Sequence, residues 1–194
     1  MQASHIRQRV MIDAVWPAAG IWREGALVAA GCLLIALSAQ LQLLLPFSPI
    51  PVTGQTFAVL LLGALYGSRR GPATVVTYLI LGAMGLPVFA GGMAGLARFV
   101  GPSAGYLLGF VVAAFAVGSL SERGWDRKPW TSAASMILGN GIIYALGIAW
   151  LWRFVGWEAV LNAGVVPFLP GDALKIALAT ILLPSGWRIM GRSA

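Results

Sequence analysis

Long apolar runs, separated by short polar or Gly- and Pro-rich segments, set the pattern of this chain. Three runs, 25–45, 101–120 and 130–152, carry no charged residue. A fourth run, 172–189, is apolar except near its two ends. A helix needs about 20 apolar residues to cross a bilayer. Each of these runs therefore predicts a membrane-spanning helix.

Two shorter apolar runs, 55–66 and 72–87, lie between the first and second long runs. At about 1.5 Å of rise per residue, each is shorter than the hydrocarbon core. We expect them to tilt, to extend into flanking segments or to be shielded by other helices. The pattern predicts an all-α polytopic membrane protein with six transmembrane helices. One membrane domain, 25–194, follows an N-terminal arm, 1–24, which we expect to lie on the membrane surface.

Composition supports the membrane class. The chain has 194 residues, 59% of them hydrophobic and 10% charged, whereas soluble domains carry roughly 25% charged residues. The net charge of +7 does not indicate nucleic-acid binding, because the basic residues lie between the apolar runs. The lone Cys32 cannot form an internal disulfide, and the lone His5 is too isolated for a metal site.

The basic residues orient the helices. With six spans and a cytoplasmic N-terminus, most of them fall in cytoplasmic segments, as the positive-inside rule requires. These residues are Arg7, Arg9, Arg23, Arg69, Arg70, Arg123, Arg127, Lys128, Arg188 and Arg192. The outer segments hold Arg98 and Arg153. Both termini are therefore predicted to be cytoplasmic, with Gln55, Asp172 and Lys175 in the outer half beside Arg98.

An acid and a base, Asp172 and Lys175, open the last apolar run. One interpretation is structural: Asp172 caps the helix and Lys175 pairs with it. The other is a ligand site, because ionisable residues at membrane depth usually face a cavity and carry function. One turn apart, the two side chains share a face. Together they suit a small solute that has both N–H donors and a carboxylate.

Further candidates for this site lie in the outer half. Arg98 follows a Gly-rich segment, GGMAGLAR, and its forked guanidinium suits a carboxylate. Gly91 allows a close backbone approach to a ligand, and Phe89 is a candidate for an apolar wall. The structural alternatives are a solvated arginine for Arg98 and plain packing for Phe89.

Three uncharged polar residues are weaker candidates. Gln55 offers both a donor and an acceptor, or is simply a polar residue at a helix end. Asn140 and Tyr144 lie four residues apart on one helix face. They either line a cavity or form hydrogen bonds between helices.

Small residues and missing motifs indicate the kind of function. Ala26 and Ala30 form a small-xxx-small pattern on the cytoplasmic half of the first helix, where a partner helix can approach closely. The chain has neither a GxxxxGK[ST] motif nor an HExxH motif. It has one His, which excludes most His-based metal and triad sites. We therefore expect binding or transport and no enzymatic activity.

Three segments, LPVFAGG, GPSAGY and PFLPGDALK, occur here in this order. With the flanking sequence from 50 to about 179 they resemble the BioY family of biotin transporters. Ser103 and Ala104 depart mildly from the family pattern, where Thr and Gly are expected.

The resemblance implies the substrate-binding S component of an energy-coupling factor (ECF) transporter, in the bacterial cytoplasmic membrane. It implies a six-helix S-component fold with both termini cytoplasmic. Biotin would bind near the outer face, and no cofactor is expected. A scaffold membrane subunit would meet Ala26 and Ala30, and ATPase subunits would supply energy. Some family members lack dedicated partners, and the sequence leaves this point open.

By this resemblance, Asp172 accepts a hydrogen bond from the ureido group of biotin. Lys175 and Arg98 bind its carboxylate or nearby polar groups, and Gln55 with Asn140 or Tyr144 completes the hydrogen bonds. The outer loop 45–54 is a candidate lid. Two alternatives stay open: the same fold with another vitamin as ligand, and a structural membrane protein in which the charge pair is only a cap.

Overall fold

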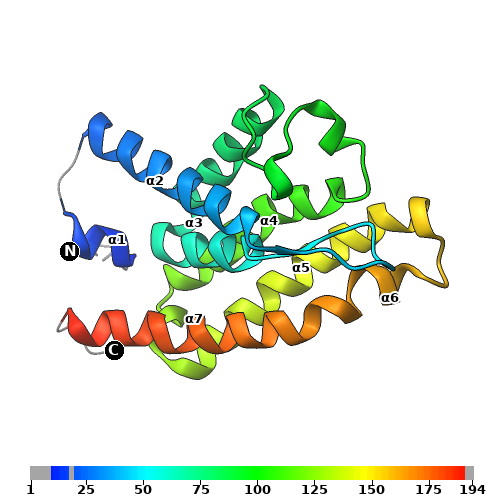
Figure 1. Cartoon of the computed structure of the whole chain (residues 1–194). Helices are drawn as coiled ribbons and strands as arrows, with labels where there is room; N and C mark the ends of the chain where they lie inside the picture. Colours follow the sequence, from blue (N-terminus) through cyan, green and yellow to red (C-terminus); the bar gives the residue numbers. More distant parts are fainter. Residues whose placement is uncertain (1–9, 18–19, 191–194) are drawn as a thin grey trace, which may run out of the picture.

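The computed structural model describes residues 10–17 and 20–190, and within these ranges the regular structure is helical apart from one small sheet. The elements in chain order are α1 (Met11–Val15), α2 (Ile21–Gln40), β1 (Gln42–Leu43), β2 (Val52–Thr53), α3 (Gln55–Ala83), η1 (Ala90–Gly92), η2 (Leu96–Phe99), α4 (Ala104–Ser121), η3 (Trp125–Arg127), α5 (Pro129–Val155), α6 (Val160–Gly164), η4 (Val166–Phe168) and α7 (Leu169–Ile189). Figure 1 shows the long helices side by side in one bundle.

Helix α3 contains both of the short apolar runs. The backbone of Gly67 has φ 84° and ψ −177°, which divides α3 into the segments 55–66 and 68–83. With this division the bundle has the six helical segments that the sequence predicts. In the described part of the chain, α2, α4, α5 and the 160–189 region are long and apolar enough to span a membrane. The two halves of α3 are largely buried against the other helices, as expected for short spans.

Arg69 and Arg70 lie within α3 and not in a separate loop, because the second half of this helix begins directly after Gly67. A positive φ favours glycine at this kink. Glu122, at the end of α4, accepts hydrogen bonds from the backbone N and the Oγ of Ser68, each at 2.8 Å. Gly118 lets α4 approach closely, since a Cβ there would lie 2.5 Å from the carbonyl carbon of Gly67. The kink is thus fixed by α4.

The first helix ends earlier than predicted, at Gln40, and the chain then forms a hairpin. Gln42 pairs with Thr53 and Leu43 pairs with Val52 in an antiparallel sheet. The loop between the strands reaches α6, where Ser48 Oγ donates to the Ala163 carbonyl at 2.7 Å. The hairpin therefore crosses the outer end of the bundle, which the helical pattern did not predict.

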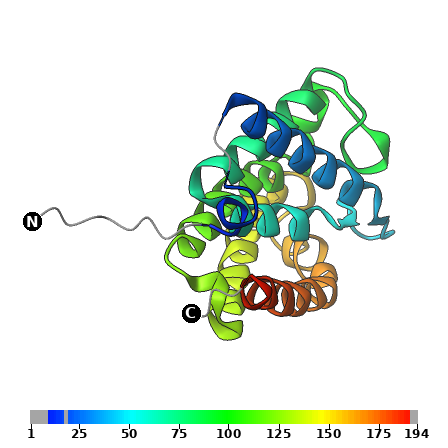
Figure 2. The same cartoon turned by 90° about the vertical axis from the view of Figure 1, so that its left-hand side faces the viewer.

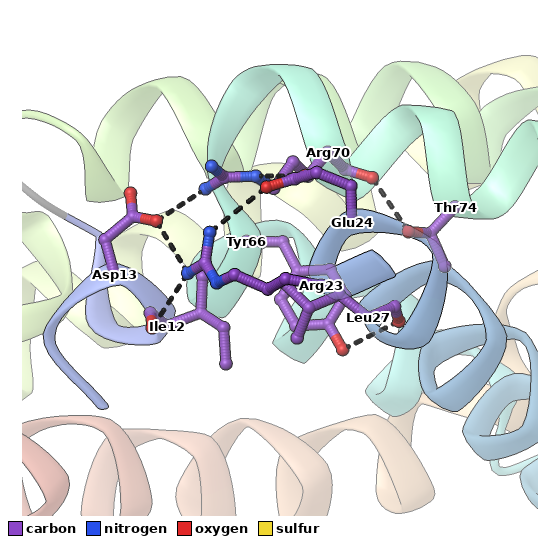
Figure 3. Close-up of polar contacts among 8 residues, drawn as sticks. All are labelled: Ile12, Asp13, Arg23, Glu24, Leu27, Tyr66, Arg70 and Thr74. Atoms are coloured by element: carbon purple, nitrogen blue, oxygen red, sulfur yellow. Dashed lines mark hydrogen bonds and ion pairs between the residues drawn. The ribbon is translucent and has the colours of Figure 1, made fainter. Parts of the chain in front are cut away.

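Four charged residues form a cytoplasmic ion network, shown in Figure 3: Asp13, Arg23, Glu24 and Arg70. Asp13 Oδ1 lies 2.9 Å from Arg23 Nη2 and 2.8 Å from Arg70 Nη1. Glu24 lies 3.1 Å from Arg23 Nη1 and 2.7 Å from Arg70 Nε. Each charge in the network has partners of opposite sign, and the network joins α1, α2 and α3.

Helix α1 packs against the bundle, and the expected position of the arm on the membrane surface stays a prediction. Met11 is buried and faces Gly186 of α7, where an added Cβ would lie 3.0 Å from the Met11 sulfur. Figures 1 and 2 both show α1 between α2 and α7 at the end of the bundle where α7 finishes. Arg7, Arg9 and Arg192 lie outside the described residues.

Candidate functional site

Asp172 and Lys175 lie in the first turns of α7 and form a buried ion pair. Lys175 Nζ is 2.9 Å from Asp172 Oδ1. Lys175 Nζ also donates to Thr56 Oγ1 at 2.9 Å and to the Thr53 carbonyl at 2.8 Å. The Tyr144 hydroxyl donates to Asp172 Oδ2. We call Thr56, Tyr144, Asp172 and Lys175 the outer charge cluster.

The cluster contradicts the helix-cap interpretation of Asp172. Helix α7 begins at Leu169, three residues earlier than predicted, and its N-cap residue is Phe168. The Asp172 carboxylate instead interacts with side chains from α3, α5 and its own helix. Its side chain is 5% exposed and that of Lys175 is 17% exposed. Burying a charge without partners is costly, so Asp172 and Lys175 each need the partners that surround them here.

A cavity of about 50 Å³ lies on the outer side of the bundle. It is lined by Ile50, Pro51, Thr53, Gln55, Phe89, Ala90, Arg98, Ser103, Tyr106, Leu107, Phe110 and Phe168. Arg98 is the one charged residue of this lining. Ile50 and Pro51 belong to the hairpin, so the predicted lid segment lines this cavity. The cavity brings Gln55, Phe89 and Arg98 together, as the sequence analysis proposed.

Arg98 lies in η2, in the segment that joins α3 to α4. In the ranges 10–17 and 20–190, no hydrogen bond or ion pair engages its guanidinium group. Burial lowers the pKa of Arg98, and the nearby Tyr78 opposes this shift. A partly buried guanidinium beside a cavity is well suited to bind an anionic group.

Gln55 is buried at the start of α3 and is held by two neighbours. Its Nε2 donates to the Tyr78 hydroxyl at 2.7 Å, and its Oε1 accepts from Thr53 Oγ1 at 3.3 Å. Tyr78 in turn donates to the Val88 carbonyl at 3.0 Å. The amide is therefore fixed in orientation at the wall of the cavity.

Two further candidates, Asn140 and Gly91, do not line the cavity. Asn140 shares a small separate hollow with Thr56 and Lys175, and its buried Oδ1 has no hydrogen-bond partner in the described structure. Gly91 is exposed with φ 71°, and it faces Gln42 rather than the cavity. The structure thus places Asn140 beside the outer charge cluster and leaves Gly91 outside both groups.

Three residues of the site, Thr56, Tyr78 and Tyr106, were not predicted from the sequence. Thr56 directly follows Gln55, and its hydroxyl contacts both charges of the pair. Tyr78 and Tyr106 come from the middle of an apolar run and from the start of α4, respectively. An isolated Tyr or Thr in an apolar run is a weak signal, because such residues are common in buried cores.

Ala26 and Ala30 are both exposed on α2. Beside them, a groove of about 610 Å³ runs between α2 and the second half of α3. Its lining is apolar apart from Glu24, Thr77 and the Tyr78 hydroxyl. This groove is larger than the outer cavity, and none of Asp172, Lys175 and Arg98 lines it. It offers an apolar helix surface rather than a site for a polar solute.

Comparison with known proteins agrees with this geometry. The model of the BioY family matches residues 8–192. The chain belongs to the BioY family. A protein of Pyrococcus horikoshii named probable biotin transporter BioY is 38% identical over 82% of this chain and 93% of its own length. The biotin transporter BioY of Rhodobacter capsulatus is 41% identical over 77% of this chain and 88% of its own.

A solved structure supports the fold. The crystal structure of the S-component for biotin from an ECF-type ABC transporter has a TM-score of 0.75 with this chain. The two are 24% identical, and the match covers 87% of this chain and 94% of the other. The predicted S-component fold is confirmed. The BioY relatives are named transporters, which agrees with the prediction of transport rather than catalysis.

Proposed function

We propose that this BioY protein binds biotin at its outer end and takes it up across the cytoplasmic membrane as the S component of an ECF transporter. The observation that carries the proposal is the combination of a largely buried acid–base cluster with a nearby cavity and an arginine, Arg98, that has no acidic partner among the described residues. Biotin has a matching set of groups, because its ureido ring carries N–H donors and a carbonyl and its valerate tail ends in a carboxylate.

The geometry favours one orientation of the ligand. Asp172 supplies an acceptor and Lys175 a donor at one place, which suits the mixed donors and acceptor of the ureido group. Arg98 has no acidic partner in the described ranges, which suits the valerate carboxylate. The apolar residues Phe89, Leu107 and Phe110 would contact the ring and the chain between these two ends. In this proposal Tyr144 and Thr56 orient the charge pair, and Gln55 and Asn140 complete the hydrogen bonds.

The proposal also includes a lid and partner subunits. The hairpin loop lines the cavity and is fastened to α6 through Ser48, and we propose that its opening admits ligand from outside. Ala26 and Ala30, on an exposed face of α2, would meet the scaffold membrane subunit. Because the chain has no phosphate-binding motif of its own, ATPase subunits would supply the energy.

Biotin binding to the purified chain tests this function. We expect saturable binding of biotin but not of thiamine or riboflavin, measured by isothermal titration in lipid nanodiscs. Uptake of labelled biotin into cells, with and without scaffold and ATPase subunits, then shows whether partners are needed. Equal binding of thiamine or riboflavin would favour another vitamin, and no saturable binding of any of them would favour a structural role.

A further inference from the structure

The phenyl ring of Phe168 stands between the outer cavity and the outer charge cluster. It lines the cavity together with Tyr106. Its ring is stacked on Tyr106 with a centroid distance of 6.4 Å, and it meets the ring of Tyr144 edge-on, also at 6.4 Å. Tyr144 is the residue that donates to Asp172. We propose that Phe168 is a movable partition, and that a ligand reaches Asp172 from the cavity when this ring swings aside. This inference rests on the proposed function.

The size of the cavity requires some such movement. A volume of about 50 Å³ holds a few water molecules, because one water needs roughly 10–15 Å³. Pockets for small ligands are typically roughly 300–1,000 Å³. Biotin, with its bicyclic head and valerate tail, therefore exceeds the cavity. The cavity holds Arg98 but neither Asp172 nor Lys175. A ligand that contacts both ends has to merge the cavity with the space around the charge cluster.

Of these three aromatic rings, Phe168 is the one whose side chain has no hydrogen bond. The Tyr106 hydroxyl donates to the Gly164 carbonyl at 2.8 Å. The Tyr144 hydroxyl is bound to Asp172. Phe168 is buried, and packing alone holds its side chain. A ring that has no hydrogen bond to break costs less to displace than either tyrosine.

The backbone around Phe168 also permits movement. The residue ends the short η4 turn and is the N-cap position of α7, where no side chain caps the helix. Gly171 lies in the next turn, and a Cβ placed there would touch nothing closer than Val52 Cγ1 at 3.9 Å. The first turn of α7 is therefore loosely packed at Gly171. The side chain of Phe168 takes part in none of the hydrogen bonds of Asp172 or Lys175.

Binding kinetics separate a partition from ordinary packing. Phe168→Ala is compared with Phe110→Ala, because Phe110 lines the same cavity and is also buried. If association is limited by displacement of the ring, Phe168→Ala raises the association rate constant for biotin roughly tenfold, as expected for the loss of two aromatic contacts. Phe110→Ala should raise the dissociation rate alone. An unchanged association rate in Phe168→Ala would overturn the partition, and Phe168→Leu repeats the test with a smaller change in volume.

A second measurement needs no ligand. 4-Fluorophenylalanine is placed at position 168 or, as a control, at 110, and the fluorine NMR spectrum is recorded in nanodiscs. We expect exchange between two environments at 168 and a single environment at 110. A single unexchanging signal at 168 would contradict the inference even if biotin binds. Two-state exchange without any biotin binding would instead contradict the proposed function, and the mobility of the Phe168 ring would still stand.

Discussion

The two ends of the bundle each contain buried or half-buried charges, but the charges are arranged differently. The cytoplasmic ion network joins α1, α2 and α3, and each of its charges has a partner of opposite sign (Figure 3). The outer charge cluster is also paired, through Asp172 and Lys175. The outer end differs in having a further cation, Arg98, beside a cavity and without an acidic partner in the described ranges.

In the proposed function, this difference separates structural charges from ligand-binding charges. A network whose charges cancel gains little from an added ion, because any newcomer has to displace an existing partner. In the proposed function, Arg98, which has no acidic partner in the described ranges, attracts an anionic group of the ligand, and the neighbouring Asp172–Lys175 pair binds its other polar groups. The comparison therefore predicts that changes at the outer end alter affinity, whereas changes at the cytoplasmic end alter stability.

The largest expected effect is on affinity at Lys175. Lys175→Met removes a buried cation and leaves the Asp172 carboxylate with only hydroxyl partners. We expect biotin affinity to fall roughly tenfold or more, since an unmatched buried group costs about 1–3 kcal/mol. Isothermal titration of the nanodisc-embedded protein measures the change. Wild-type affinity in Lys175→Met would show that the charge pair does not bind biotin.

Arg98→Gln should weaken biotin binding roughly tenfold, through loss of a charge-assisted bond to the carboxylate. The effect should depend on the ligand, because biotin amide lacks that carboxylate. We expect the amide to bind wild type and Arg98→Gln with similar affinity in competition assays. An equal loss for biotin and its amide would place Arg98 away from the valerate end.

At the cytoplasmic end, Arg23→Met should lower stability and leave biotin affinity unchanged. Arg23 is 6% exposed and bonds to Asp13, Glu24 and the Ile12 carbonyl. Removing it should lower the free energy of unfolding by about 1–2 kcal/mol. The loss is small because Asp13 and Glu24 are partly exposed and keep Arg70 as a partner. Thermal unfolding followed by tryptophan fluorescence measures the loss. A large fall in affinity without a fall in stability would contradict the division between the ends.

The smallest effect concerns Asp126 in η3, a buried acid outside the ion network. Burial raises the pKa of Asp126 to about 6, although a hydrogen bond from Trp187 opposes the shift. Because the folded state then binds the proton more tightly than the unfolded state, stability is greater at pH 5 than at pH 7. The expected gain is about 1 kcal/mol. Asp126→Asn should abolish this pH dependence of thermal unfolding. If the pH dependence persists in this variant, another titrating group causes it.

The sequence predicted the helices better than their connections. Apolar runs located all six helical segments, because burial in lipid or protein leaves a strong periodic or continuous apolar signal. The hairpin at 42–53 and the absence of a loop after Gly67 were not predicted. Both depend on contacts between distant segments, such as Ser48 with Ala163 and Ser68 with Glu122.

The candidate site was predicted in part for the same reason. Charged residues in an apolar chain are conspicuous, so Asp172, Lys175 and Arg98 stood out. The structure separates them into two groups, which spacing along the chain does not reveal. Gly91 lies outside both groups, and Tyr144 contacts Asp172 directly. The ligand-binding roles of all these residues, like those of Gln55, Asn140 and the Ala26–Ala30 face, stay predictions.

A matched pair of substitutions tests the central claim most directly. Asp172→Asn and Asp13→Asn each neutralise one acid, the first in the outer charge cluster and the second in the cytoplasmic ion network. Equilibrium binding of biotin to both variants and to wild type in nanodiscs is the measurement. We predict roughly tenfold or greater loss of affinity for Asp172→Asn and wild-type affinity for Asp13→Asn. Equal affinities in all three proteins, or a loss confined to Asp13→Asn, would contradict the account.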